Sequence, residues 1–189
     1  MEQYNLYPLV LDIERLREFC LIHGKLVKFN KGDAFVEPGS VGRNFGIVVS
    51  GYFKYTTLNH RNEEAVANFA FKDELIGDFC NSYVGNKAVA RIIAGTESTA
   101  YVIPFSKLKE LAHDQYPDFE STAYEALFRM IYNRIYLLYR YSPEERYKML
   151  IENYCDAIEQ VALKDIASHL MISPTHLSRI RKKMGFNPI

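Results

Sequence analysis

The chain has 189 residues, of which 23 are Lys or Arg and 23 are Asp or Glu, so its formal net charge is zero. A chain of this length buries roughly 70% of its unfolded surface, which allows one large domain or two small ones. Because there is no overall basic excess, any affinity for nucleic acid has to come from a local patch.

The three cysteines, Cys20, Cys80 and Cys155, lie far apart and form no CxxC pair. This pattern argues against a disulfide framework, a zinc site or an iron–sulfur cluster, and it favours a reducing compartment. No apolar run approaches roughly 18 residues, and the N-terminus lacks the layout of a signal peptide. We therefore expect a cytoplasmic protein with no membrane contact, no metal site and no cofactor.

Residues 25–104 are predicted to be β structure. A short helix is expected over residues 12–22, and turn signals at Gly32, Gly39 and Gly51 then separate short strands. Closely spaced short strands with glycine at the corners are typical of a barrel or sandwich. The predicted strands are Lys25–Phe29, Ala34–Val36, Phe45–Val49, Tyr52–Leu58, Ala65–Phe71 and Ser98–Ile103.

A long amphipathic helix is predicted to follow Pro117 and to run to Tyr141. Its apolar side chains recur at helical spacing and form one continuous ridge. Such a ridge can pack within the chain or against the same helix of a second copy. We expect dimerisation, because proteins that read two-fold DNA sites need one such seam. The residues expected on this ridge are Tyr124, Leu127, Phe128, Ile131, Ile135, Leu138 and Tyr139.

The segment Ser142-Pro143-Glu144-Glu145 carries the signals of a helix start. Ser142 suits the N-cap, Pro143 the first helical position, and Glu145 the third position of a capping box. A new helix is predicted there, followed by a short linker around Cys155–Glu159.

The segment Leu163–Met184 is predicted to be a helix-turn-helix. Its first helix has apolar or small residues at helical spacing, and Ser173 and Pro174 suit the N-cap and first position of its second helix. Met171 stands in the turn where glycine is usual in this motif, so we expect it to adopt a left-handed conformation. The residues expected to be buried are Ile166, Ala167, Leu170, Leu177, Ile180 and Met184.

The opposite face of the second helix is cationic. Between Pro174 and Met184 there are four formal positive charges and no acidic residue. Arginine can form a bidentate pair with guanine, and Lys, Ser and Thr contact phosphates, so this pattern predicts a DNA-binding face. Its expected residues are Ser173, Pro174, Thr175, His176, Ser178, Arg179, Arg181, Lys182 and Lys183. The alternatives are an ordinary helical hairpin with a solvated basic face and a protein-interaction module that binds an acidic partner.

This order of parts resembles the CRP/FNR family of bacterial transcription regulators over nearly the whole chain. Gly32, Gly39 and Gly51 match glycines of that family's β-roll, and residues 75–78 (LIGD) are similar to its Ile-Gly-Glu segment. Arg179 matches the arginine with which the family reads guanine.

The resemblance implies an α+β fold with an N-terminal double-stranded β-helix (a jelly-roll-like β-roll), a long dimerisation helix and a C-terminal helix-turn-helix domain. The expected domains are residues 1–112, 113–141 and 142–189. The implied protein is a homodimeric regulator that binds two-fold symmetric double-stranded DNA, with RNA polymerase as a further candidate partner. No nucleophile–base pair or phosphate-binding loop indicates an enzyme.

The chain departs from the family where members hold the phosphate of cyclic AMP. Those members use an Arg-Ser or Arg-Thr pair, and Ala88 and Val89 occupy the matching positions here. A buried phosphate would lose several kcal/mol without these donors, which argues against gating by cyclic AMP. Asp78 is also one methylene shorter than the family's ribose-binding glutamate. A pocket for an unidentified small-molecule effector, such as an anion, would involve Gly77, Asp78, Lys87, Ala88, Val89 and Arg91.

Other features of the family are also missing. Only Cys20 lies near the N-terminus, where the oxygen sensors bind an iron–sulfur cluster, and His23, His60 and His113 are too isolated to suggest a haem site. Five residues follow Met184, so the family's β-hairpin wing is expected to be reduced or absent.

Overall fold

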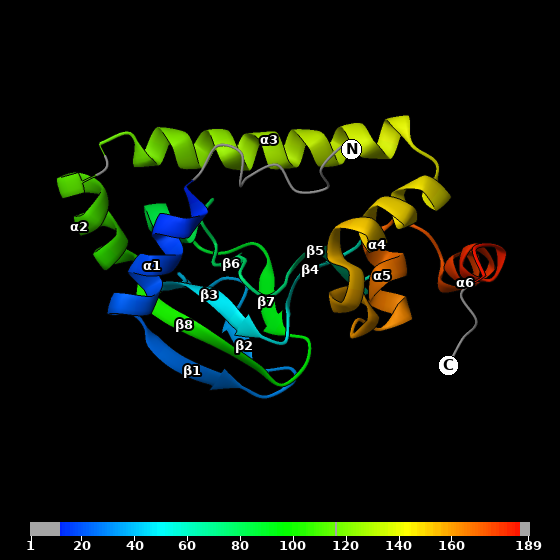
Figure 1. The fold of residues 1–189 in the computed structure, drawn as a ribbon, viewed down its shortest axis with the longest axis horizontal. Helices are drawn as coiled ribbons and strands as arrows, with labels where there is room; N and C mark the ends of the chain where they lie inside the picture. The colour runs from blue at the N-terminus through cyan, green and yellow to red at the C-terminus, as the bar shows by residue number, and fades with distance from the viewer. Residues whose placement is uncertain (1–11, 116, 186–189) are drawn as a thin grey trace.

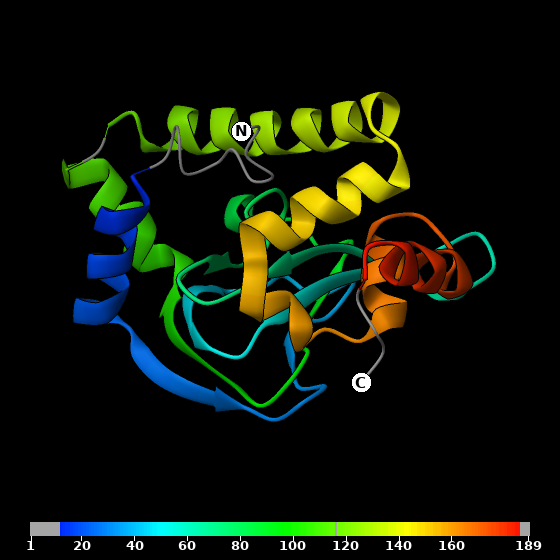
Figure 2. The same cartoon turned by 45° about the vertical axis from the view of Figure 1, so that its right-hand side comes forward.

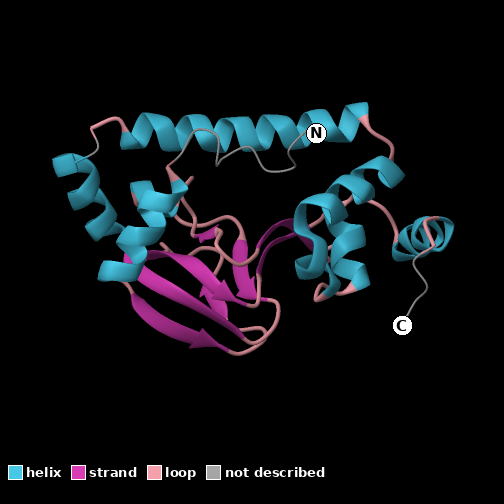
Figure 3. Cartoon of the chain, viewed as in Figure 1, coloured by secondary structure: helices cyan, strands magenta, loops and turns pink. Residues whose placement is uncertain are grey.

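The computed structural model describes residues 12–115 and 117–185, and it has the predicted α+β class (Figure 1). Strands gather at one end of the molecule, and a unit made of helices occupies the other end (Figure 3). One long helix, α3 (Phe119–Arg140), runs beside both parts. The prediction of a β-roll, a long helix and a C-terminal helical unit is confirmed.

The roll consists of two four-stranded antiparallel sheets, with strand orders β1-β8-β3-β6 and β2-β7-β4-β5. The strands are β1 (Lys25–Phe29), β2 (Ala34–Val36), β3 (Asn44–Ser50), β4 (Phe53–Leu58), β5 (Glu64–Ala70), β6 (Leu75–Ile76), β7 (Arg91–Ala94) and β8 (Ser98–Pro104). The six predicted strands are all present, with their ends shifted by no more than one residue. The sequence did not predict β6 and β7, because they are too short and too apolar to show a clear alternation.

Gly51 makes the tight turn between β3 and β4. Its φ is +71°, and a Cβ atom at this position would lie 2.3 Å from the Ser98 hydroxyl and 2.6 Å from the Glu97 carbonyl oxygen. The turn therefore requires glycine both for its backbone conformation and for the space beside it.

Apolar side chains fill the space between the two sheets, where Phe53, Ile92 and Ala100 are fully buried. A second apolar cluster closes one end of the roll. There the helices α1 (Ile13–His23) and α2 (Phe105–Gln115) pack on the strands. A short 3-10 helix, η2 (Ser82–Val84), follows β6. Among the described residues, no helix combines the length and the apolarity needed to cross a bilayer.

The helical unit consists of α4 (Pro143–Glu159), α5 (Leu163–His169) and α6 (Pro174–Lys183). α4 begins with the predicted capping box: the Glu145 amide donates to the Ser142 hydroxyl, and the Ser142 amide donates to the Glu145 carboxylate. The predicted linker over Cys155–Glu159 is wrong. The helix is kinked at Cys155 (φ 28°, ψ −112°) but then continues, because Ile158 in its last turn is buried in the core of the unit.

The expected domain boundaries at residues 113 and 142 stay a prediction. In the structure α2 ends at Gln115 and α3 begins at Phe119, so the long helix starts a few residues after the expected boundary. The boundary at residue 142 coincides with the N-cap of α4.

Candidate nucleic-acid interface

The turn between α5 and α6 closes the first helix of the helix-turn-helix. The Met171 amide donates to the Ser168 carbonyl, and the Ile172 amide donates to the Ala167 carbonyl. With Met171 at φ 57°, these bonds form a Schellman motif. The predicted left-handed conformation of Met171 is confirmed, and the helix ends there without glycine.

The second helix begins and packs as expected. The Ser173 hydroxyl accepts a hydrogen bond from the His176 amide at 3.1 Å, and Pro174 occupies the first position of α6. Leu177 and Ile180 are buried, and Met184 packs at the edge of the same cluster. One side of α6 is therefore fixed against α4 and α5, and its other side is open to a partner.

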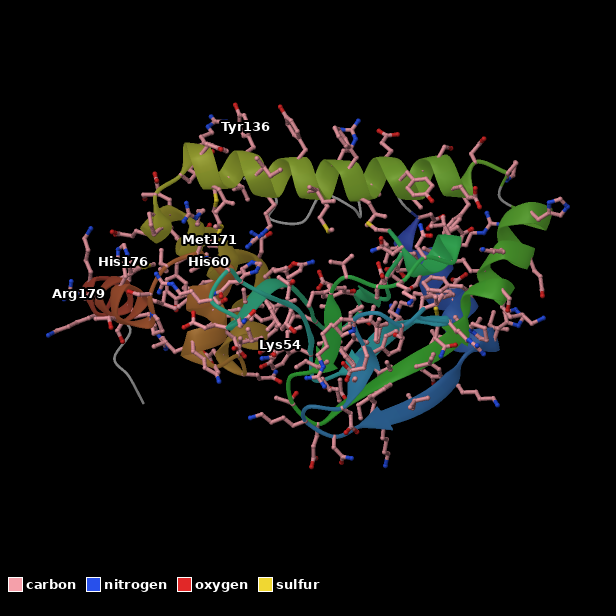
Figure 4. All side chains as sticks on the ribbon, turned by 180° about the vertical axis from the view of Figure 1, so that it is seen from behind. Lys54, His60, Tyr136, Met171, His176 and Arg179 are labelled. Atoms are coloured by element: carbon pink, nitrogen blue, oxygen red, sulfur yellow. The ribbon has the colours of Figure 1, made fainter. Side chains whose placement is uncertain are left out.

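The exposed side of α6 carries the predicted DNA-binding residues. All nine are exposed except Arg181, which is half-buried. In Figure 4, the labelled Arg179 points outward at the end of the molecule, away from the roll. The cationic residues of this face are Arg179, Arg181, Lys182 and Lys183, and His176 belongs to the same face.

One of these cations has an acidic partner that the sequence pattern did not reveal. Lys183 Nζ lies 2.7 Å from Glu144 Oε2, which belongs to the first turn of α4. Both side chains are at least partly exposed, so the pair contributes little to stability. A phosphate that approached Lys183 would have to compete with this carboxylate.

The helix-turn-helix does not project freely from the roll, because α5 is docked on the β4–β5 hairpin. In Figure 2 the hairpin runs past α5, and its turn lies beside the turn between α5 and α6. Tyr52, Val66 and Phe69 of the roll share one apolar cluster with the core of the helical unit. The roll and the helix-turn-helix thus have a common core.

A buried ion pair crosses this interface. Lys54 Nζ in β4 lies 3.1 Å from Asp165 Oδ2 in α5 and 2.7 Å from Glu64 Oε1 in β5. The Lys54 and Asp165 side chains are 11% and 10% exposed. Burial lowers the pKa of Lys54, but the hydrogen bonds to Glu64 and Asp165 outweigh it, so this pKa is raised and Lys54 stays charged. The Val66 amide also donates to the Ser168 hydroxyl at 2.9 Å.

Helix α3 holds the other side of α5. Arg134 donates to the His169 carbonyl, and its second terminal nitrogen lies 2.8 Å from His169 Nε2. Burial, and to a smaller extent the positive charge of Arg134, lower the pKa of His169 well below its ordinary value. A hydrogen bond with the Ala67 backbone raises this pKa but does not compensate. His169 is therefore neutral when the protein is folded near pH 7.

Helix α3 itself has two distinct apolar faces. One face lies against the roll and the helical unit, where Phe119, Ala126 and Leu137 are buried. The other face is exposed, and its rings stack in sequence, Phe128 on Tyr132 and Tyr132 on Tyr136. Figure 4 shows the labelled Tyr136 pointing away from the roll.

The predicted dimerisation residues fall mostly on the exposed face. Tyr124, Phe128, Ile131 and Ile135 are between 45% and 68% exposed, whereas Leu127 and Leu138 are half-buried. Leu127 lines a cavity on the inner side of the helix. Sequence periodicity placed the exposed Tyr139 on the ridge but missed two exposed tyrosines of this face, Tyr132 and Tyr136.

A cavity of about 430 Å³ lies between the roll and α3. Its lining is largely apolar, with β5 on one side and Ala123, Leu127 and Met130 of α3 on the other. Glu74 and Asp78 are its acidic residues, and none of the described residues that line it is a Lys, Arg or His. The cavity therefore suits an apolar ligand without negative charge.

The structure brings together only half of the predicted effector-pocket residues. Gly77, Asp78 and Val89 line the cavity, but Lys87, Ala88 and Arg91 do not. Arg91 instead forms a bidentate pair with Glu37, with N···O distances of 2.7 and 2.9 Å. Arg91, a candidate to bind an anionic effector, is thus held by a carboxylate outside the cavity.

The cysteines offer no metal site. Cys20 is fully buried, and burial raises its pKa to about 12, whereas Cys80 and Cys155 are exposed. Within the ranges 12–115 and 117–185, no group of three or more His, Cys, Asp or Glu side chains is placed to hold a metal ion.

Comparison with known proteins agrees with this architecture. Residues 26–115 match the family described as the cyclic nucleotide-binding domain, and no curated protein matches the chain. Among solved structures, FixK2 from Bradyrhizobium japonicum is similar with a TM-score of 0.72 at 13% identity, covering 86% of this chain and 84% of that one. The fold of FixK2 extends over both the roll and the helical unit of our chain.

Two further structures show the same likeness. TTHA1359, described as a transcriptional regulator of the CRP/FNR family from Thermus thermophilus, has a TM-score of 0.61 at 16% identity, covering 85% of this chain and 86% of that one. The regulator CLP of Xanthomonas campestris has a TM-score of 0.62 at 16% identity, with coverages of 92% and 90%. Residues 26–115 are thus similar to cyclic nucleotide-binding domains, and the chain as a whole has the fold of the CRP/FNR regulators. The predicted resemblance is confirmed.

Within this CRP/FNR fold, the positions that departed from the family's phosphate-binding pattern have no anion-binding geometry. Ala88 is buried, and Val89 is 70% exposed. The Asp78 carboxylate accepts hydrogen bonds from the Asn81 amide and side chain and from the Ser82 hydroxyl, so it holds the loop before η2. The expected loss of the CRP/FNR wing concerns residues 185–189, of which 186–189 lie outside the described residues.

Proposed function

We propose that the protein is a homodimeric, sequence-specific DNA-binding transcription regulator that acts in the cytoplasm on two-fold symmetric sites. The observation that carries this proposal is the exposed cationic face of α6, which points away from the roll at one end of the molecule. The regulators with the same fold support it, since one is described as a transcriptional regulator and another as a global regulator of gene expression.

In this proposal the residues of α6 divide into two roles. Arg179 reads a base, preferably guanine, because its guanidinium can donate two parallel hydrogen bonds in the major groove. Lys182 and Lys183 bind backbone phosphates, which adds affinity for any sequence. Further groove contacts come from Thr175, His176, Ser178 and Arg181, and Ser173 and Pro174 hold the helix start in place.

The exposed face of α3 supports the homodimer. Its aromatic and aliphatic side chains form a continuous stripe along a 22-residue helix, and such stripes are typical of interaction surfaces. Two copies that paired along this stripe would present their α6 helices to half-sites about one helical turn apart, roughly 34 Å. RNA polymerase is a further partner in this proposal, because a regulator that activates transcription must contact it.

The test is selection of bound sequences from a random pool of double-stranded DNA. We expect a two-fold symmetric consensus, with a guanine in each half that depends on Arg179. The absence of any enrichment, together with no shift of DNA at low salt, would contradict both the function and the dimer. That outcome would favour a protein-interaction module whose basic helix binds an acidic partner.

A second candidate function is regulation by a ligand, and the cavity between the roll and α3 favours it. The lining of this cavity fits an apolar ligand, neutral or cationic, better than a small anion or the phosphate of cyclic AMP. A thermal-shift screen should include aromatic and aliphatic amines, neutral hydrophobic compounds, organic acids and cyclic nucleotides. We expect stabilisation by members of the first two classes, and stabilisation by cyclic AMP alone would contradict this assignment.

A further inference from the structure

The link between α3 and the helix-turn-helix is short. α3 ends at Arg140, Tyr141 and Ser142 are extended, and α4 begins at Pro143. Arg146 donates to the Tyr141 carbonyl at 2.8 Å, which ties α4 to the link itself. The helical unit could rotate about this link, and a contact at the link itself resists such rotation only weakly. The orientation of α6 relative to α3 therefore has to be set mainly by contacts farther from the link.

Three polar contacts on α5 meet this requirement, and we call them the docking contacts. They are Lys54 with Asp165 at 3.1 Å, the Val66 amide with Ser168 at 2.9 Å, and Arg134 with His169 at 2.8 Å. They join α5 to β4, to β5 and to α3 respectively. α5 is thus held from both the roll and the long helix.

The chemistry of these contacts suits the fixing of an orientation. The apolar cluster beneath α5 favours burial but has little directionality, so it tolerates some sliding or rotation of the unit. Hydrogen bonds depend strongly on angle and distance, and a buried ion pair is costly when it is broken. The docking contacts therefore select one arrangement among those that the apolar cluster allows.

In this arrangement the cationic face of α6, the proposed DNA-recognition helix, is accessible to DNA. Figures 1 and 4 place α6 at the end of the molecule toward which α3 runs, and Arg179 points outward there. A two-fold axis along α3 would put both recognition helices on the same side of a dimer. Their distance from this axis would be constant only while α5 stays docked.

We propose that Lys54, Ser168 and Arg134 are positioning residues for DNA recognition, which set the spacing between the two recognition helices by holding α5 on the roll. This proposal rests on the proposed function above. It assigns base recognition to the exposed face of α6 and half-site spacing to the buried face of α5. None of the three residues needs to touch DNA for this role.

The test uses charge reversal across the buried pair. Lys54→Glu and Asp165→Lys each place like charges at the interface, whereas the double variant restores an opposite pair, and its relocated ammonium group can also interact with Glu64. Binding is measured to the selected two-fold site, to the same site with about five extra base pairs between its halves (half a helical turn), and to a single half-site.

We expect the full-length wild type to prefer the original spacing by about tenfold or more over the lengthened site, because two fixed helices bind together only at matching spacing. Each single variant should lose most of this preference and keep the half-site affinity. The double variant should regain it. Ser168→Ala, a milder change, should reduce the preference less. Single variants that keep the full spacing preference would overturn the positioning role.

A matched control lies on the same roll. Arg91→Glu and Glu37→Arg reverse the charges of an ion pair that does not touch the helical unit, so they should leave the spacing preference unchanged. An equal loss in these controls would show a general effect of charge reversal and would also overturn the proposal.

A second measurement needs no DNA. Cys80 and Cys155 are exposed and lie on the roll and on α4, and the fully buried Cys20 resists labelling. Spin labels on the two exposed cysteines, in protein diluted with unlabelled chains, should give one narrow distance in the wild type and in the double variant, and a broad distribution in each single variant. Narrow distributions in all four proteins would overturn the proposal. If the wild type binds no DNA at all, the proposed function fails instead.

Discussion

The two faces of the helix-turn-helix unit are built differently. The outer face of α6 consists of exposed polar and cationic side chains, of which Lys183 has a carboxylate partner and Arg179 points into solvent. The inner face of α5 carries a buried ion pair, a buried histidine and an apolar cluster shared with the roll. Changes on the outer face should alter binding and leave stability intact, whereas changes on the inner face should alter stability as well.

The largest effect is expected from removal of Lys54. Lys54→Ala leaves the Asp165 carboxylate buried without this cation, so the free energy of unfolding should fall by about 3–5 kcal/mol. The measurement is denaturant unfolding at pH 7. Lys107→Ala, which removes an exposed pair with Glu110, is the control and should cost less than about 1 kcal/mol. Equal losses in the two variants would mean that the inner face is no more sensitive than the surface.

On the outer face, Arg179→Ala should weaken binding to the selected site by about 1–3 kcal/mol and relax base preference at one position of each half-site. The free energy of unfolding should not change, because the side chain is exposed. Binding isotherms on the selected site and on single-base variants measure both effects. An unchanged base preference would show that Arg179 does not read the groove.

The pH dependence of stability tests the buried histidine. The pKa of His169 is lowered in the folded state, so below the unfolded value of about 6.5 the unfolded chain binds the proton more readily. Stability is therefore complete above this value and falls as pH drops through it toward the folded pKa. From pH 7.5 to 5.5 the loss from this one group should be about 1.4 kcal/mol.

His169→Gln should remove this part of the pH dependence, whatever it does to stability at pH 7.5. His60→Gln is the control, since His60 lies exposed on the β4–β5 turn. Unfolding curves at the two pH values measure the difference. A pH dependence that His169→Gln leaves unchanged would contradict the assignment of a neutral buried histidine.

The smallest effect concerns the turn between the two faces. Met171 is 70% exposed and has φ 57°. A left-handed conformation costs a non-glycine residue about 1–2 kcal/mol. Glycine avoids this cost, but it lowers stability by about 0.4–1 kcal/mol because it gives the unfolded chain more conformational freedom. Met171→Gly should therefore stabilise the protein by about 0.5 kcal/mol, seen as a rise in Tm of about 1–2 °C.

Asn62 offers the matched control. It has φ 58°, but asparagine tolerates this conformation better than methionine does. Asn62→Gly should therefore raise Tm less than Met171→Gly. If Met171→Gly lowered Tm, the left-handed residue would have to be stabilised by contacts that methionine makes and glycine lacks.

The parts of the fold that depend on neighbouring residues were predictable from the sequence. The caps at Ser142 and Ser173 and the strained position of Met171 are local signals, and all three appear as expected. The periodicity of α3 likewise predicted a long helix with a continuous apolar ridge. The exposed face contains more aromatic side chains than the predicted ridge did, because Tyr132 and Tyr136 also lie on it.

The docking of the two parts was not predictable. Lys54 and Asp165 are separated by 111 residues, and each resembles an ordinary surface charge in the sequence. Nothing in the sequence around Arg134 or His169 indicates a partner. Their partners become apparent only when β4, β5 and α3 surround α5. The cavity was missed for the same reason, because its lining comes from five separate stretches of the chain.

The pair between Lys183 and Glu144 has a consequence for how the protein would search a chromosome. To contact a phosphate, Lys183 must leave a carboxylate 2.7 Å away, and this exchange is the same at every position along a duplex. In the proposed function, the pair would lower retention on random DNA without changing the preference among sites. A molecule with zero net charge and one masked cation would leave unrelated sequences quickly, so more of its time would be available for scanning.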